Sequence, residues 1–263
     1  MNWRKQFLDS FKRLTYRNQD WRAWSDFVEL AACAISNRLD KSKYDEREKR
    51  YLEIVKGYER AEVDEFPKLL ACVAGALDED PEQDFLGALF QELELSSHWK
   101  GQFFTPYHLC RVMADMQTGD IVERVQENGY VTVNDPACGA GALMIAFANA
   151  ARSRGVNYQE RILFVAQDID RTAALMCYIQ LSLLGCPGYV IIGDTLSRPG
   201  LHPENDVWYT PMWFVGGWQT RFIVQKIATL VRDVEKRQDQ AEPVAEANIE
   251  PIEPAEPLQL VLF

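Results

Sequence analysis

Several common signatures are absent from this sequence. It has no Cys-x-x-Cys pair, only three histidines, and no apolar run near the roughly 18 residues that a membrane-spanning helix needs. Histidines without cysteine or carboxylate partners at ligand spacing predict no metal site, and the six cysteines are expected to be buried free thiols. The N-terminus lacks the hydrophobic segment of a signal peptide. We therefore expect a cytoplasmic protein with no bound metal and no membrane contact.

An excess of positive charge is also missing. The net charge is −11, whereas a general nucleic-acid binder carries a basic face. Residues 238–263 contain one Asp, five Glu and no Lys or Arg, so they carry −6 and leave −5 for residues 1–237. A body of −5 can still present a local basic groove. The charge therefore weakens a hypothesis of DNA binding without excluding it.

Residues 131–146 are the most informative part of the chain. Val131 to Val133 is a β-branched run, the Asn-Asp-Pro of residues 134–136 interrupts it, and Gly139 and Gly141 frame a tight loop before an apolar helix. A strand, a glycine loop and a helix in this order are typical of a nucleotide-binding βαβ unit. The spacing is not Gly-x-Gly-x-x-Gly. The carboxylate at the strand end favours S-adenosylmethionine, which carries a sulfonium and an ammonium, over a dinucleotide.

Two further strands are predicted downstream. Residues 161–168 form an apolar run that ends in Asp168, residues 189–194 form another, and an apolar helix is expected between them over 172–184. In a doubly wound sheet an acid at the end of the second strand hydrogen-bonds ribose hydroxyls. Asp168 is the predicted ribose ligand and Asp170 is the alternative. The pattern indicates an α/β fold.

The glycine loop resembles that of a known family. Asp135-Pro-Ala-Cys-Gly-Ala-Gly141 is similar to the cofactor loop of the adenine-specific (N6) DNA methyltransferases, above all the modification subunits of type I restriction-modification systems. Gly101-Gln-Phe-Phe-Thr-Pro106 resembles that family's other cofactor motif, in the same order along the chain. The resemblance covers residues 84–213. It implies a Rossmann-like domain that uses S-adenosylmethionine.

The same resemblance implies a set of cofactor-binding residues. Phe103, Phe104 and Thr105 would line the methionine end of the cofactor, and Asp194 would face its adenine. The complete predicted set is Phe103, Phe104, Thr105, Asp135, Pro136, Ala137, Gly139, Gly141, Asp168, Ile169, Asp194 and Thr195.

The catalytic position departs from the family. Its members carry Asn or Asp, then Pro-Pro and an aromatic, because an amide oxygen and a backbone carbonyl accept the two hydrogens of the target amine while the aromatic stacks on the flipped base. No Asn-Pro-Pro-aromatic string occurs in this chain. The best match is residues 206–213, where Thr210, Pro211 and Trp213 form the predicted catalytic pocket.

Three segments are predicted. Residues 1–100 form a helical N-terminal domain, residues 101–237 a methyltransferase-like domain that binds S-adenosylmethionine, and residues 238–263 a disordered acidic tail. The helical domain is expected to cap the catalytic domain. A role in facing DNA, through Arg47, Lys49 and Arg50, is the alternative.

The tail ends in an apolar hexapeptide, residues 258–263. Its sequence resembles the pentapeptide by which bacterial replication and repair proteins bind the DNA sliding clamp. By this resemblance Gln259 would occupy a polar site on the clamp, while Leu262 and Phe263 would enter a hydrophobic pocket on it. The predicted partner-binding residues are Gln259, Leu260, Leu262 and Phe263. The alternative is a terminal strand that folds back on the protein's own sheet.

Three functions remain open at this stage. The first is an adenine-specific DNA methyltransferase that is weak or depends on a partner, such as a specificity or target-recognition subunit, because about fifty residues after Trp213 are too few for the remaining strands and a recognition domain. The second is a catalytically inactive, cofactor-binding regulatory or decoy subunit. The third is a methyltransferase that acts on a non-DNA amine.

Overall fold

The computed structural model describes residues 1–95, 104–224 and 227. Met1–Gln219 form one compact unit, and a second unit begins at Thr220, of which only residues 220–224 and 227 are described and are helical. The predicted tail and the segment 101–103 lie outside the described residues. Within those residues, none of the helices has the length and apolar character that crossing a membrane requires. All six cysteines are buried and free, as predicted.

Residues 1–95 are largely helical. The helices are α1 (Trp3–Thr15), α2 (Asp20–Leu39), α3 (Tyr44–Val55), α4 (Arg60–Val63), α5 (Phe66–Glu79) and α6 (Phe85–Glu92). Local sequence sets two of the starts, because the side chains of Asn2 and Asp84 accept hydrogen bonds from free backbone N–H groups in the first turns of α1 and α6. Phe7, Trp24 and Phe27 pack ring against ring at the centre of this bundle.

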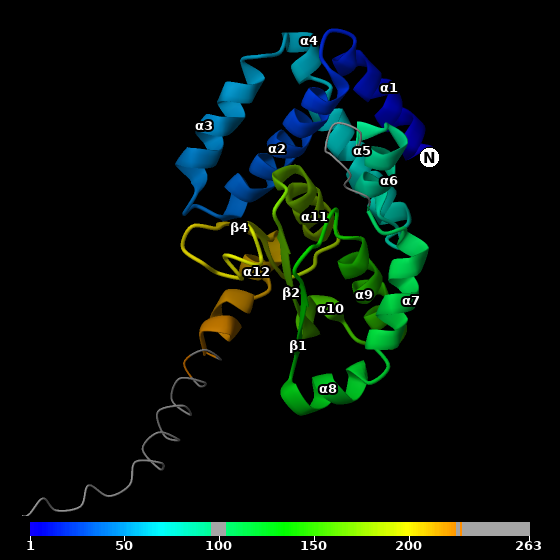
Figure 1. The fold of residues 1–263 in the computed structure, drawn as a ribbon, viewed down its shortest axis with the longest axis vertical. Helices are drawn as coiled ribbons and strands as arrows, with labels where there is room; N and C mark the ends of the chain where they lie inside the picture. Colours follow the sequence, from blue (N-terminus) through cyan, green and yellow to red (C-terminus); the bar gives the residue numbers. More distant parts are fainter. Residues whose placement is uncertain (96–103, 225–226, 228–263) are drawn as a thin grey trace, which may run out of the picture. The chain divides into compact units, whose positions relative to one another are not determined.

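The rest of the unit is an α/β sheet domain (Figure 1). Its strands are β1 (Val131–Asp135), β2 (Ile162–Asp168), β3 (Gly188–Ile192) and β4 (Asp206–Tyr209), and its helices are α7 (Tyr107–Gln117), α8 (Ile121–Asn128), α9 (Ala142–Ser153), α10 (Tyr158–Arg161), α11 (Arg171–Leu183) and α12 (Pro211–Val215). The strand order is β1-β2-β3-β4, with β1, β2 and β3 parallel and β4 antiparallel to β3. The predicted α/β class is confirmed.

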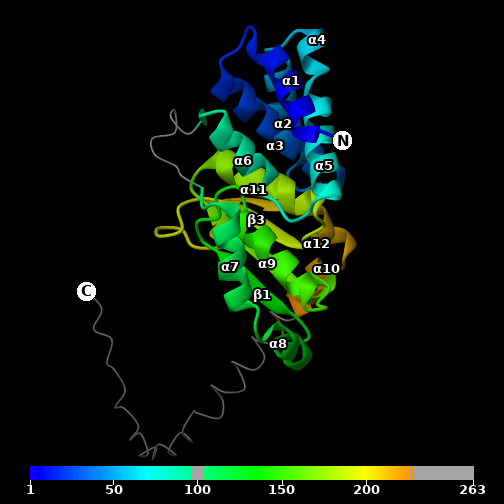
Figure 2. The same ribbon diagram turned by 90° about the vertical axis from the view of Figure 1, so that its right-hand side faces the viewer.

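The two crossover helices lie on one face of the sheet. α9 contacts β1, and α11 contacts β2 and β3, as expected when successive right-handed crossovers run in one direction. Their shared core continues into the N-terminal helices, since α11 packs along α2 (Figure 2). On the opposite face, the Trp213 ring of α12 stacks against Tyr209 and meets Tyr189 edge-on.

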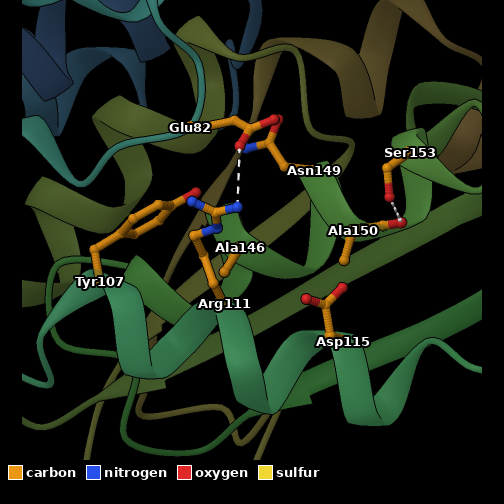
Figure 3. Close-up of a pocket in the computed structure, with 8 residues that line it drawn as sticks. All are labelled: Glu82, Tyr107, Arg111, Asp115, Ala146, Asn149, Ala150 and Ser153. Atoms are coloured by element: carbon orange, nitrogen blue, oxygen red, sulfur yellow. Dashed lines mark hydrogen bonds and ion pairs between the residues drawn. The ribbon is translucent and has the colours of Figure 1, made fainter.

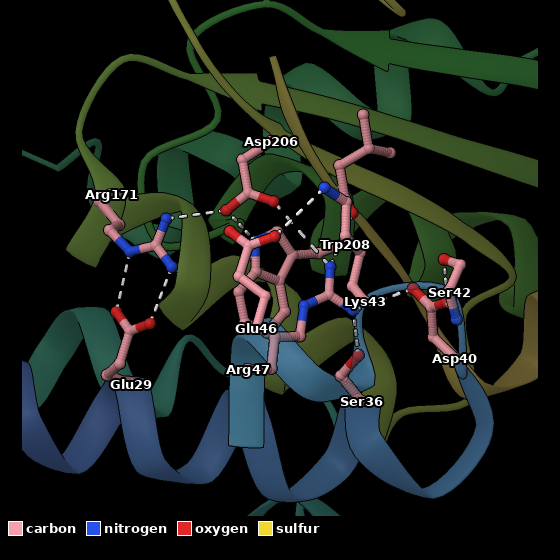
Figure 4. Close-up of polar contacts among 11 residues, drawn as sticks. Glu29, Ser36, Asp40, Ser42, Lys43, Glu46, Arg47, Arg171, Asp206 and Trp208 are labelled. Atoms are coloured by element: carbon pink, nitrogen blue, oxygen red, sulfur yellow. Dashed lines mark hydrogen bonds and ion pairs between the residues drawn. The ribbon is translucent and has the colours of Figure 1, made fainter. Parts of the chain in front are cut away.

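A polar cluster joins the helical cap to the sheet (Figure 4). The Arg47 side chain is only 4% exposed and donates to Asp40 and to the backbone carbonyl of Val207, both at 2.9 Å. Its guanidinium lies 3.9 Å from the ring centroid of Trp208. Arg47 therefore cannot face DNA, contrary to the alternative drawn from the sequence, because all of its contacts are inside the protein.

Candidate functional site

The loop after β1 is shaped by two glycines. Gly139 has φ +53° and Gly141 has φ +97°, a left-handed region that other residues rarely adopt. A Cβ atom on Gly139 would lie 2.9 Å from Cδ1 of Phe104, and one on Gly141 would lie 2.9 Å from Sγ of Cys177. The loop therefore needs glycine at both positions for space as well as for conformation, and it leads directly into the N-terminus of α9.

Asp168 holds this loop in place. Its Oδ2 accepts the Gly139 N–H at 2.8 Å and its Oδ1 accepts the Asp170 N–H at 2.9 Å. The backbone N–H of Cys138 also donates to the carbonyl of Gln167 at 3.0 Å. The carboxyl ends of β1 and β2 are thus joined through the loop. The predicted ribose ligand is largely buried and already accepts two backbone hydrogen bonds, which gives it a positioning role.

A cavity of about 200 Å³ opens beside the loop. Five of the predicted cofactor residues line it: Phe104, Thr105, Asp135, Ala137 and Gly139. The sequence analysis missed other lining residues, notably Cys110 and Met113 of α7. The helical period that follows Pro106 was a signal for them, because residues three apart on one helix share a face.

Asp135 gives this cavity its electrostatic character. Burial raises the pKa of the Asp135 carboxyl, the backbone N–H of Ala137 lowers it by donating to Oδ1 at 3.1 Å, and the neighbouring Asp168 raises it further. A carboxylate that is costly to ionise alone is stabilised by a cationic ligand. The cavity is therefore chemically suited to an ammonium or sulfonium group.

The segment after β3 lies at the same end of the sheet, beside the loop after β1. The Thr195 hydroxyl donates to the carbonyl of Pro136 at 2.6 Å, so these two predicted cofactor residues contact each other. Asp194 accepts from the Leu196 N–H and the Ser197 hydroxyl, and these hydrogen bonds hold the pKa of its carboxyl below the usual range. Ile169 is 70% exposed at this edge.

The structure does not bring the predicted catalytic residues to this site. β4 is antiparallel to β3, so the carboxyl end of β4 lies beside the amino end of β3. The glycine loop lies at the other end of the strands, at the carboxyl ends of β1 and β2. Thr210 is fully buried at the amino end of β3; its hydroxyl donates to the Cys186 carbonyl at 2.8 Å and accepts the Gly188 N–H at 3.1 Å. Pro211 begins α12, and Trp213 is buried against Tyr189. The three residues predicted to form the catalytic pocket therefore lie at the other end of the strands from the glycine loop.

A smaller cavity of about 80 Å³ lies between α7 and α9 (Figure 3). Its charged groups are already paired: Arg111 lies 3.9 Å from Glu82, and Asp115 lies 3.1 Å from Arg154. A space of this size holds water rather than a cofactor. It is not the candidate site.

One comparison with known proteins, with models of protein families, found a match. The model of the N-6 DNA methylase family matches residues 86–249, which is more than half of the chain. The α/β sheet and the glycine loop after β1 are compatible with a protein of the DNA methylase class. The chain belongs to the N-6 DNA methylase family. No curated protein and no solved structure matched it.

Proposed function

We propose that the chain binds S-adenosylmethionine in the cavity beside Asp135. The single observation that carries this proposal is the position of a partly buried carboxylate beside a loop whose two glycines leave no room for a Cβ atom. At about 200 Å³ the cavity is smaller than the ~300 Å³ at which ligand pockets generally begin, so it accounts for one end of the cofactor. Asp135 would take the cationic end, while Phe104, Thr105, Ala137 and Gly139 would form the walls. Gly101, Gln102 and Phe103 of the same motif lie outside the described residues.

We further propose that the bound cofactor serves methylation of the N6 amine of adenine in DNA, on a Rossmann-like scaffold. When bound, the cofactor supplies an activated methyl group. The chain's own contribution is to orient the donor and to hold its positive charge. The conjugated amine still needs two hydrogen-bond acceptors and a stacking ring for the flipped base. The acceptors and the stacking ring would come from a partner such as a target-recognition subunit. Thr210, Pro211 and Trp213 lie at the other end of the strands from the cavity.

The same observation favours a second candidate function, a cofactor-binding regulatory subunit without catalysis. The two candidates share donor binding and differ in turnover. Isothermal titration with S-adenosylmethionine and with its demethylated product tests the shared part. Transfer of a labelled methyl group to adenine-containing DNA, with and without target-recognition subunits, tests turnover. Binding without transfer to DNA, protein or small amines would select the regulatory function, and absence of binding would reject both.

The terminal peptide supports a separate proposal, that Gln259, Leu260, Leu262 and Phe263 bind the DNA sliding clamp. All four lie outside the described residues, so their sequence alone carries it. Tethering to a clamp would raise the effective concentration of an acidic protein on DNA. We expect clamp binding in a pull-down with the full chain and its loss when residues 258–263 are deleted. Retention after the deletion would reject the proposal.

A further inference from the structure

Gln180 is a buried polar residue in a helix that is otherwise largely apolar. It lies on α11 and is fully buried. Burying a carboxamide costs free energy unless its hydrogen-bonding groups find partners. The partners of Gln180 come from two other segments, the start of α6 and the glycine loop after β1. One side chain therefore connects the helical cap to the loop that forms the cavity.

The hydrogen bonds of Gln180 use both of its donors and its acceptor. Nε2 donates to Oδ1 of Asp84, the N-cap residue of α6, at 2.7 Å and to the carbonyl of Ala140, in the glycine loop, at 2.8 Å. Oε1 accepts the N–H of Leu86, in the first turn of α6, at 3.1 Å. Ala140 lines the cavity beside Asp135. The carboxamide thus fixes a residue of the cavity wall relative to α6.

The same helix also holds a second part of the cavity wall. Gln91 of α6 donates to the Phe104 carbonyl at 3.0 Å, and the ring centroids of Phe90 and Phe104 lie 5.3 Å apart. Phe104 lines the cavity together with Ala140, and a Cβ atom on Gly139 would lie 2.9 Å from its ring. Gln180 therefore contacts the glycine loop directly and is connected to Phe104 through α6.

We propose that Gln180 is a positioning residue for the donor site, whose carboxamide holds the glycine loop and α6 at the separation that the methyl donor requires. This inference rests on the proposed function, because it concerns binding of S-adenosylmethionine in the cavity beside Asp135. It also couples that binding to the helical cap. Coupling between two sites is reciprocal, so a bound donor should in turn stabilise the first turn of α6.

Gln180→Met is the direct test, because methionine is similar in length and size but has no N–H to donate to Asp84 or Ala140. At a temperature where the variant is folded, donor affinity in isothermal titration should fall by roughly tenfold or more. Amide hydrogen exchange in residues 137–141 should become faster even without the donor. In the parent, the donor should slow exchange at Leu86 and Gly87, and this slowing should be lost in Gln180→Met.

Asn149→Leu is the matched control. Asn149 is also a buried carboxamide, on α9, and its Nδ2 donates to the carbonyl of Pro81, in the segment before α6, at 2.8 Å. It does not line the cavity beside Asp135. Both variants should melt at a lower temperature than the parent, but Asn149→Leu should keep the parental donor affinity and loop exchange. Circular dichroism checks that each variant is folded.

Gly87→Ala disturbs the same contact without changing Gln180 or the cavity lining. A Cβ atom on Gly87 would collide with the Asp84 carboxylate, which must then leave the position where Gln180 binds it. Donor affinity should fall in this variant as well. The double variant should bind the donor no more weakly than Gln180→Met alone, because both changes break one set of contacts. Gly87→Ala also provides the test if Gln180→Met does not fold.

The results distinguish this inference from the proposed function. A parent chain that binds no donor would overturn both. A parent that binds the donor, with Gln180→Met and Gly87→Ala at parental affinity, would overturn this inference alone. An equal loss of affinity in Asn149→Leu would also overturn it, because lower stability would then explain the effect. Donor binding that leaves exchange at Leu86 and Gly87 unchanged in the parent, or slows it equally in Gln180→Met, would contradict the coupling to α6.

Discussion

The backbone N–H of Gly139 donates to Oδ2 of Asp168 at 2.8 Å, which ties the loop after β1 to the end of β2. This contact is made between residues 29 positions apart and fixes the cavity wall. Asp168→Asn replaces one acceptor oxygen by an N–H₂ group and should cost about 1–3 kcal/mol of unfolding free energy. It should also weaken donor binding in isothermal titration. Asp45→Asn, at an exposed position of α3 and not in the cavity lining, is the control and should leave donor affinity unchanged.

Gly139→Ala should reduce donor affinity by roughly tenfold or more, because the added Cβ would lie 2.9 Å from the Phe104 ring at the cavity wall. The left-handed φ adds about 1–2 kcal/mol of strain. Gly155→Ala is matched for strain, since Gly155 has φ +79° with nothing within 4 Å of its Cβ position. Both variants should melt at lower temperature, but only Gly139→Ala should lose affinity. Equal affinities in the two variants would contradict this account of the cavity.

The Asp135 carboxylate is predicted to lower the free energy of unfolding and to strengthen binding of a cationic donor. Burial raises its folded-state pKa, so ionisation costs stability: its contribution is most favourable below the ordinary carboxyl pKa and is lost as the pH rises through the raised value. Asp135→Asn should therefore unfold no more easily than the parent at neutral pH, while binding the cationic donor more weakly. Parent affinity should also fall as the pH is lowered through the raised pKa. Denaturant titrations and calorimetry across pH measure the two trends, and an Asn variant of undiminished affinity would contradict them.

Thr210→Val tests the corrected role of the segment that was predicted to be catalytic. Valine keeps the shape but leaves the Gly188 N–H without its side-chain acceptor, so the variant should lose about 1–3 kcal/mol of unfolding free energy in urea. Donor affinity should be unchanged at temperatures where the variant is folded. Thr210→Asn should likewise destabilise the protein and gain no methyl transfer, because the position is fully buried away from the cavity.

Arg47→Met should be strongly destabilising, by about 3–5 kcal/mol, because it leaves the Asp40 carboxylate buried without its cation. The matched change Arg50→Met removes an exposed arginine from the same helix and should be close to neutral. Thermal unfolding of the pair measures the difference. Similar melting temperatures would show that the polar cluster of Figure 4 contributes little to stability.

The local elements were predictable because their causes are local. The alternation of β-branched and polar residues around Val131, the glycines at 139 and 141, and the helical period of the first ninety-five residues each act through neighbouring backbone, and the structure has a strand, a tight loop and helices at those places. The clustering of Asp135, Gly139 and Asp168 at one edge also followed from sequence. Parallel strands joined by right-handed crossovers bring their carboxyl ends together.

The direction and partner of β4 were decided only by tertiary structure. Nothing in the local sequence of Asp206 to Tyr209 indicates whether the strand runs parallel or antiparallel to β3. In a parallel strand Thr210 would lie at the same end of the sheet as the cavity, whereas in the observed antiparallel strand it lies at the other end. The position of Arg47 was also not predictable from local sequence. A highly charged helix does not indicate that one of its arginines is buried over Trp208, about 160 residues later in the chain. The sequence by itself determined the glycine loop and the α/β class, because backbone conformation and side-chain period act over a few residues. Long-range pairing decided which residues reach that loop, because the contacts that compete for a strand edge or a buried charge are set by the whole fold.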